Sequence, residues 1–289
     1  MTFAPAALLL VLAQPPVEED VCAIALCARR VPSIAEELMR VLPLESQQGG
    51  LVVGTIAPGS RVRLDDQDVA VAPDGRLVMG FDRDHGPTAR LVITAPDGSV
   101  RRHEMRIAAR RWSLQHVNVA RNLPREGDVS WTRREAEVLR INAARARTTD
   151  AQGWRQDFIW PARGRISGRF GSQRIYRGEP GSYHSGVDVA AGTGAPVVAP
   201  ADGVVVLAAD APFSFEGNLL IVDHGAGLSS SFLHLSRIDV HEGERVRQGQ
   251  RIGSVGATGR ASGPHLHWSL TWRGAKLDPE RVVGAMEPR

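Results

Sequence analysis

The chain has 289 residues, of which 43% are hydrophobic and 23% are charged, as is usual for a soluble globular protein. The net charge of +3 is mild for this length, and Lys276 is the only lysine among the basic residues. The sequence has neither a basic run nor a motif of interleaved basic and aromatic residues, which argues against a nucleic-acid-binding protein. Thirty glycines and eighteen prolines indicate many turns and favour a β-rich structure.

The N-terminal stretch has features of an export signal. An apolar run from Phe3 to Leu12 precedes the small residue Ala13. This pattern predicts a signal peptide over residues 1–13, although no positive charge precedes the run. The run is too short to span a bilayer as a helix, and no other segment is long and apolar enough. We therefore expect a periplasmic or secreted protein without a transmembrane segment.

Residues 14–49 form an N-terminal segment that contains both cysteines of the chain, Cys22 and Cys27. In an oxidising compartment these could close a small disulfide loop, and otherwise they would remain inert thiols. A metal site is disfavoured because no further cysteine or histidine lies beside them.

The next part, residues 50–112, consists of short runs of alternating apolar and polar residues. The runs are separated by Pro58-Gly59, Pro73-Asp74-Gly75 and Pro96-Asp97-Gly98, residue types that favour tight turns. This pattern predicts short strands that form a small module of the β-sandwich type.

A linker over residues 113–152 contains a helical pattern from Ser130 to Thr148. From residue 153 onward, apolar runs again alternate with glycine-containing turns. We therefore predict an all-β fold in which a small β-module, a linking helix and a β-rich domain over residues 153–289 follow one another.

Two of the nine histidines stand two positions apart in "SGPHLHWSL", residues 262–270. Residues i and i+2 of a strand project from the same face, so His265 and His267 should lie side by side. Leu266 and Trp268 should then point to the opposite face. Two imidazoles on a packed face are unfavourable unless they bind something. The alternative is a pair of half-exposed histidines on an edge strand.

Further candidates occur in "YHSGVDV" and "SSFLHLS". His184 and Asp188 are four apart among strand-forming residues, so both can face one site, and His234 stands at a strand end. Catalytic zinc takes three nitrogen or carboxylate ligands and keeps an open position. His184, Asp188 and one histidine of the C-terminal pair would supply such a set. Each of these histidines taken alone is more often a surface or core residue.

The motifs "HSGVD", "HLS" and "TGRASGPHLHW", in this order, resemble those of the lysostaphin-type (LytM-like) zinc metalloendopeptidases, which cut the peptides of bacterial cell walls. The resemblance covers about residues 160–279. It implies that His184, Asp188 and His267 bind one Zn²⁺ ion per chain. It also implies that His234 and His265 are the catalytic histidines, without saying which acts as general base and which stabilises the oxyanion.

Three other residues are candidates for positions around the substrate groove that is expected over the metal. Some relatives place a tyrosine shortly before the first zinc histidine, and Tyr183 precedes His184 here without an assigned role. His224 lies in a "DHG" turn and is expected to be structural or at the groove edge. Arg260 is expected to help shape the turn that presents the last strand.

The sequence thus predicts an exported zinc endopeptidase that hydrolyses stem or cross-link peptides of peptidoglycan, its expected partner. One alternative is a non-catalytic or autoinhibited module that binds the wall and activates other hydrolases. A second alternative is a zinc peptidase that acts on proteins. A purely structural zinc site is disfavoured, because such sites are usually closed by four ligands.

Overall fold

The computed structural model describes residues 42–120 and 129–286, all of which fall in one compact unit of the chain. The predicted signal peptide, residues 1–13, and the two cysteines, Cys22 and Cys27, lie outside the described residues. Among the helices of the described ranges, none is long and apolar enough to cross a bilayer.

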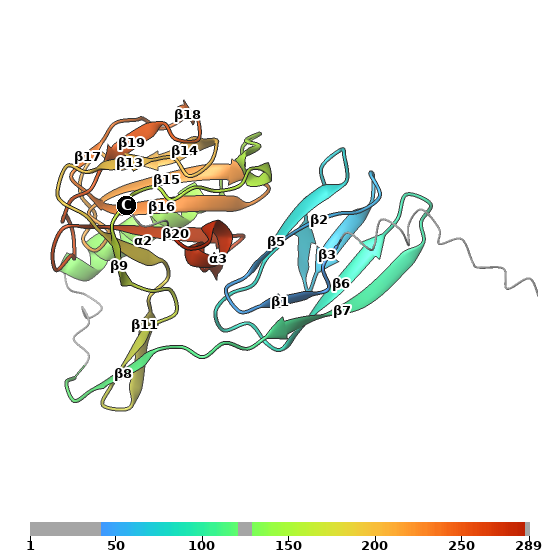
Figure 1. The fold of residues 1–289 in the computed structure, drawn as a ribbon, viewed down its shortest axis with the longest axis horizontal. Coiled ribbons are helices and arrows are strands. Elements are labelled where there is room, and N and C mark those ends of the chain that lie inside the picture. The colour runs from blue at the N-terminus through green and yellow to red at the C-terminus, as the bar shows by residue number, and fades with distance from the viewer. Residues whose placement is uncertain (1–41, 121–128, 287–289) are drawn as a thin grey trace, which may run out of the picture. The chain divides into compact units, whose positions relative to one another are not determined.

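The first part of the described chain is a small β-module (Figure 1). Five strands form one sheet in the order β1-β7-β6-β3-β4, and β2 pairs with β5 in a two-stranded sheet. Apolar residues on β5 and β6 are buried in one core; burial alternates along β6 as the sequence pattern predicted, whereas four consecutive residues of β5 are buried. The strand bounds are β1 Glu45–Gln47, β2 Leu51–Thr55, β3 Arg61–Leu64, β4 Gln67–Val69, β5 Arg76–Gly80, β6 Thr88–Thr94 and β7 Val100–Ala108.

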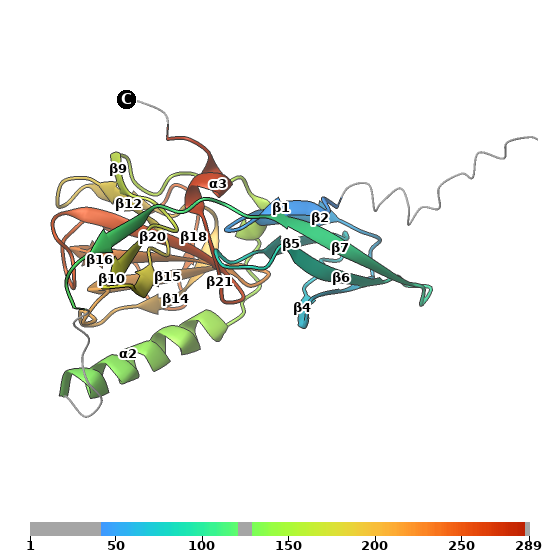
Figure 2. The ribbon, with the colours of Figure 1, turned by 90° about the horizontal axis from the view of Figure 1, so that it is seen from below.

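The following segment contributes one strand and one helix. Strand β8 (Leu114–Val117) runs parallel to β10 (Gln173–Tyr176), which pairs with β11 (Glu179–Tyr183) in a three-stranded sheet. Helix α2 (Val129–Ala146) lies close to the predicted helical range and packs along the main sheet (Figure 2). Its buried residues Ile141 and Ala144 join an apolar cluster with residues of β14 (Gly203–Ala208) and β15 (Asn218–Gly225).

The C-terminal part is built on an eight-stranded sheet in the order β18-β14-β15-β16-β20-β12-β9, with β21 paired to β20. A three-stranded sheet, β13-β19-β17, accompanies it. The mostly-β architecture agrees with the predicted fold class. The remaining bounds are 3-10 helix η1 Gly153–Arg155, β9 Arg165–Gly168, β12 Val187–Ala190, β13 Pro196–Val198, β14 Gly203–Ala208, β15 Asn218–Gly225, β16 Leu228–Leu235, β17 Arg237–Ile238, β18 Arg245–Val246, β19 Arg251–Ser254, β20 His265–Trp272, β21 Ala275–Leu277 and helix α3 Pro279–Val283.

The pairing of β12 with β20 sets up one face of the main sheet. Asp188 lies directly opposite His267 in the antiparallel register, and directly opposed residues project from the same face. The neighbouring pair of Val187 and Trp268 is fully buried in the core on the other face. Nδ1 of His267 and Nε2 of His265 lie 2.8 and 3.8 Å from the same oxygen of Asp188, so the two histidines share a face of β20, as strand alternation predicted.

Candidate active site

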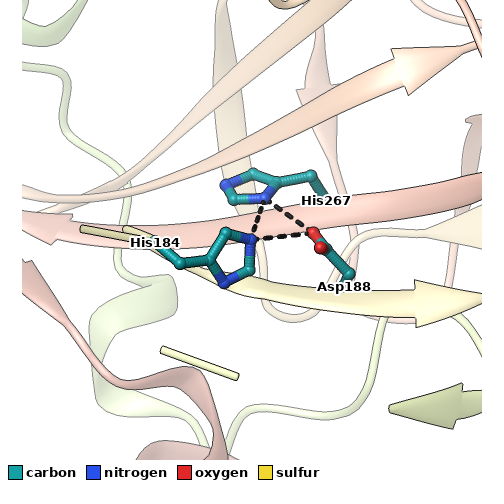
Figure 3. A group of neighbouring side chains, drawn as sticks. All are labelled: His184, Asp188 and His267. Carbon is teal, nitrogen blue, oxygen red and sulfur yellow. Dashed lines mark hydrogen bonds and ion pairs between the residues drawn. The ribbon is translucent and has the colours of Figure 1, made fainter. Parts of the chain in front are cut away.

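Three side chains converge on this face of the sheet: His184, which precedes β12, Asp188 on β12 and His267 on β20 (Figure 3). The Nε2 atom of His184 lies 3.0 Å from Oδ1 of Asp188 and 3.0 Å from Nδ1 of His267. The same Asp188 oxygen lies 2.8 Å from Nδ1 of His267. Two nitrogens and one oxygen thus form a small triangle of possible metal donors.

Backbone groups fix the orientation of His184 within this triangle. Its Nδ1–H donates to the carbonyl oxygen of Arg169 at 3.0 Å, which leaves Nε2 as the ring atom that faces Asp188. Metal-binding histidines commonly have their second ring nitrogen held in this way.

Two glycines make room for the other two side chains of the triangle. A Cβ atom at Gly168 would lie 2.3 Å from Oδ2 of Asp188. A Cβ atom at Gly186 would lie 2.9 Å from Nε2 of His267 and 2.3 Å from the carbonyl oxygen of Trp268. Any side chain at either position would therefore displace a residue of the triangle.

Burial and the contacts between the three residues shift their pKa values in opposite directions. Burial lowers the pKa of His267 to about 4, against the raising effect of its bond to Asp188. Burial also disfavours protonation of His184, but its contact with Asp188 outweighs that effect and raises its pKa. The pKa of Asp188 is lowered, because the two histidines outweigh the effect of burial. Asp188 therefore stays ionised over the physiological pH range.

The donor set suits a zinc ion. Zinc binds imidazole nitrogen and carboxylate oxygen, and donors about 2.0–2.1 Å from a tetrahedral ion lie roughly 3.3–3.4 Å from one another. The three donor atoms lie 2.8–3.0 Å apart, so each separation would have to increase by about half an ångström or less to reach that spacing. The side chains of His184 and Asp188 are each 23% exposed, so the group is open to solvent. Within the described residues the cluster has three members, which suits an open rather than a closed site.

Two further histidines border the triangle. The ring of His234, near the end of β16, lies 4.8 Å from the ring of His265 and 6.3 Å from that of His267, measured between centroids. The Nδ1–H of His234 donates to the carbonyl oxygen of Thr258, and that of His265 donates to the carbonyl oxygen of Gly263, both at 2.8 Å. Each ring therefore keeps Nε2 available, and Nε2 of His265 lies 3.8 Å from Asp188.

The remaining predicted candidates occupy different surroundings. His224 is fully buried, and its ring nitrogens bond to the Asp202 carbonyl and the Ser230 hydroxyl, so the structure places it in the core. Tyr183 donates its hydroxyl hydrogen to Asp82 of the β-module at 2.8 Å. Arg260 is exposed on the loop before β20, and its guanidinium lies 5.4 Å from the ring centre of Phe215.

Several groups that shape the site were not identified from the sequence. The carbonyls of Arg169, Thr258 and Gly263 orient three histidine rings, but any residue type offers a carbonyl, so the sequence carries no signal for them. Gly168 does leave a signal, since a glycine at the end of an otherwise ordinary strand suggests close approach of another group.

Comparison with known proteins identifies similarity over this region. The sequence profile described as "Peptidase family M23" matches residues 182–279, a stretch that contains all five residues of the triangle and its border. A solved structure from Pseudomonas aeruginosa, classed as peptidase M23, is 30% identical and superimposes with a TM-score of 0.65. That match covers 83% of this chain and 96% of the other.

Curated relatives match shorter stretches. The peptidoglycan DD-endopeptidase ShyA of Vibrio cholerae is 42% identical over 127 residues, which are 43% of this chain and 27% of that protein. The murein hydrolase activator NlpD of Escherichia coli is 32% identical over 136 residues, which are 47% of this chain and 32% of that protein. The chain therefore spans about a third or less of the length of these two relatives.

Proposed function

Because the chain belongs to peptidase family M23, we propose that it is an exported, zinc-dependent endopeptidase that hydrolyses peptide bonds in peptidoglycan. The observation that carries this proposal is the donor triangle of His184, Asp188 and His267, bordered by two imidazoles with available Nε2 atoms. In this proposal the three triangle residues bind one zinc ion. His234 acts as the general base, and His265 stabilises the oxyanion.

The proposed chemistry needs both kinds of group. Zinc bound there would lower the pKa of a bound water molecule and polarise the scissile carbonyl. His234, whose burial lowers its pKa, is neutral at pH 7 and able to accept a proton at Nε2. His265, when protonated at Nε2, would donate a hydrogen bond to the oxyanion that forms during attack. The two carbonyl contacts keep a hydrogen on Nδ1 of both rings, so Nε2 of neutral His234 can accept a proton, whereas Nε2 of His265 donates only in the imidazolium form.

The substrate class is proposed from the relatives. ShyA is described as a DD-endopeptidase of peptidoglycan, and it aligns with the chain over more than a third of the chain's length. By this likeness we propose that the scissile bond is a DD-peptide bond in a peptidoglycan cross-link. A periplasmic or secreted location, which the sequence also predicts, would bring the chain to that polymer.

Digestion of purified, cross-linked sacculi tests the proposal. The chain from Gln14 onward, loaded with zinc, should release fragments and remove cross-linked dimers, and mass spectrometry of the fragments would name the bond. A His267→Ala variant should release none, because it lacks one donor of the triangle. Undiminished digestion by this variant, or intact sacculi with the wild type, would contradict the proposal.

A second candidate function is activation of other wall hydrolases. The likeness to NlpD, which is described as a murein hydrolase activator, favours it. The complete donor triangle favours the enzyme. If the zinc-loaded wild type leaves sacculi intact but accelerates a separate wall hydrolase, the activator function would replace the endopeptidase. Cleavage of an unfolded protein but not of sacculi would instead indicate a general zinc peptidase.

A further inference from the structure

The backbone of residues 169–173, called here the His184 cradle, makes three hydrogen bonds to His184. The carbonyl of Arg169 accepts from the ring, the N–H of Gly171 donates to the His184 carbonyl at 2.8 Å, and the carbonyl of Ser172 accepts from the His184 N–H at 2.8 Å. The position and ring orientation of His184 therefore depend on the position of the cradle.

The cradle is held by an arginine from the N-terminal β-module. Arg83, in the loop between β5 and β6, donates from Nε to the Gly171 carbonyl and from one terminal nitrogen to the Gln173 side chain, both at 3.0 Å. The amide of Gln173 in turn donates to the Gly181 carbonyl on β11 at 2.7 Å. Arg83 thus bonds to the carbonyl of Gly171, and the N–H of Gly171 bonds to the carbonyl of His184. These two hydrogen bonds connect Arg83 with the backbone of His184.

The surroundings of Arg83 are unusual for a charged residue. Its side chain is only 7% exposed, and its carboxylate partner Asp84 is 62% exposed. The guanidinium also lies over the rings of Trp112 and Tyr183, at 5.2 and 4.8 Å from their centres. Burying a charge is unfavourable unless its hydrogen bonds are well satisfied. Arg83 is buried and donates to a backbone carbonyl in the segment that holds a candidate metal ligand. This arrangement points to a positioning role.

The residue before Arg83 fixes the same loop. The carboxylate of Asp82 accepts a hydrogen bond from the Tyr183 hydroxyl and another from the Lys276 backbone N–H, each at 2.8 Å. Tyr183 directly precedes His184, and Lys276 lies on β21, which pairs with the strand that carries His267. The loop is therefore anchored to both chain segments that supply histidines to the triangle.

From these contacts we infer that Arg83 is a positioning residue for His184, so that the N-terminal β-module contributes directly to metal affinity. The inference rests on the proposed function only in taking His184 as a metal ligand. By this inference the β-module helps to form the metal site and is more than a domain joined to the peptidase domain. Removing the guanidinium would leave the Gly171 carbonyl and the side-chain oxygen of Gln173 without their donor, and the cradle would be free to move.

The test compares zinc affinity among full-length variants by competition with a chromophoric chelator. Arg83→Gln should weaken zinc binding by about 10- to 100-fold, the usual effect of losing a group that orients a ligand. Asp74→Asn is the matched control, because Asp74 also joins the β-module to the C-terminal part, through Arg155, but does not touch the cradle. This control should bind zinc within about twofold of the wild type.

Thermal unfolding separates positioning from stability. All affinities are measured well below the unfolding midpoints, so a variant that is merely less stable would bind zinc as tightly as the wild type, and that result would overturn the inference. If Arg83→Gln does not fold, Arg83→Lys carries the test, since it keeps the charge but loses the forked geometry; unchanged affinity in that folded variant would be equally decisive. His184→Ala should lose most zinc binding, and its failure to do so would contradict the proposed ligand set instead of the role of Arg83.

Discussion

The imidazoles of His234 and His265 face each other, with ring centroids 4.8 Å apart, although regular strand alternation would place His234 on the opposite side of the sheet. Leu233 pairs with His267 and shares its face, so the next residue of a regular strand would face away. Instead, His234 has a φ of +64°, and β16 shifts register against β15 at this point. The irregular backbone turns His234 towards the site.

Alanine variants of these two histidines should separate chemistry from metal binding. Neither His234 nor His265 belongs to the donor triangle, so each variant should still bind one zinc ion per chain. Because a general acid or base contributes about 10²- to 10⁴-fold, kcat on a cross-linked muropeptide should fall at least about 100-fold. Zinc content and turnover are measured on the same samples. A variant that loses its zinc would show that its histidine is a ligand instead.

Helix α2 holds the loop that fixes His234. The backbone N–H of His234 donates to the Glu216 carbonyl at 2.8 Å. The Glu216 carboxylate accepts two hydrogen bonds from Arg134 of the helix, at 2.6 and 2.8 Å. Charge-assisted, paired hydrogen bonds of this kind also fix geometry. The helix therefore stabilises the unusual backbone of a proposed catalytic residue, in addition to linking two parts of the chain.

An Arg134→Gln variant should consequently lower kcat by roughly tenfold while zinc affinity stays unchanged, since the triangle does not depend on this loop. Arg140→Gln is the control on the same helix, because it removes an exposed ion pair with Asp210, of a kind that contributes little to stability. Steady-state kinetics of both variants provide the comparison. Equal losses of kcat would mean that the helix acts through stability alone.

Strand spacing predicted one part of the site, the shared face of His265 and His267, but the choice of His267 for the triangle came from the family resemblance, and His184 lies outside a strand. Residues two apart on a strand share a face, and His265 and His267 do so on β20. The position of His234 was not accessible by that reasoning, since it depends on a left-handed backbone at a residue other than glycine. The sequence offered His234 only as a histidine at a strand end, and its proposed catalytic role came from the resemblance to a known family.

The sequence also could not predict which distant segments of the chain contact each other. Arg83 and Gly171 are 88 positions apart, and no spacing rule relates them. Short strands were also missed: β1 lies in the predicted N-terminal segment and β8 in the predicted linker, where three or four residues are too few for a clear alternation. Such strands form because a longer neighbour supplies the pairing partner.

Gly168 gives a further prediction about the triangle. An alanine there would bring its Cβ within 2.3 Å of Oδ2 of Asp188, so the carboxylate must move. Zinc affinity should fall by at least about tenfold, as for other losses of ligand orientation. Gly192→Ala is the matched control, because no atom outside its immediate neighbours lies within 4 Å of a Cβ built there. Zinc competition titrations of both variants test this, and equal affinities would refute it.

His224 should make the folded protein sensitive to acid. Burial lowers its pKa from 6.5 to about 4, against the raising effects of the Asp202 carbonyl and of the charges on Asp223 and Asp202. Between these two pH values the unfolded chain binds a proton that the folded chain does not. The free energy of unfolding therefore falls as the pH falls through this range. One pKa unit corresponds to 1.36 kcal/mol, so the full effect is about 3 kcal/mol.

A His224→Gln variant isolates this effect. Glutamine can still donate to the Asp202 carbonyl and accept from Ser230, but it does not titrate. Urea unfolding of metal-free wild type and variant at pH 7, 6 and 5 should show a shallower pH dependence for the variant, by up to about 1.4 kcal/mol per pH unit. Other acid-sensitive groups, including the donor triangle, are common to both proteins and cancel in the difference. Parallel pH curves would show that the proton taken up on unfolding binds elsewhere.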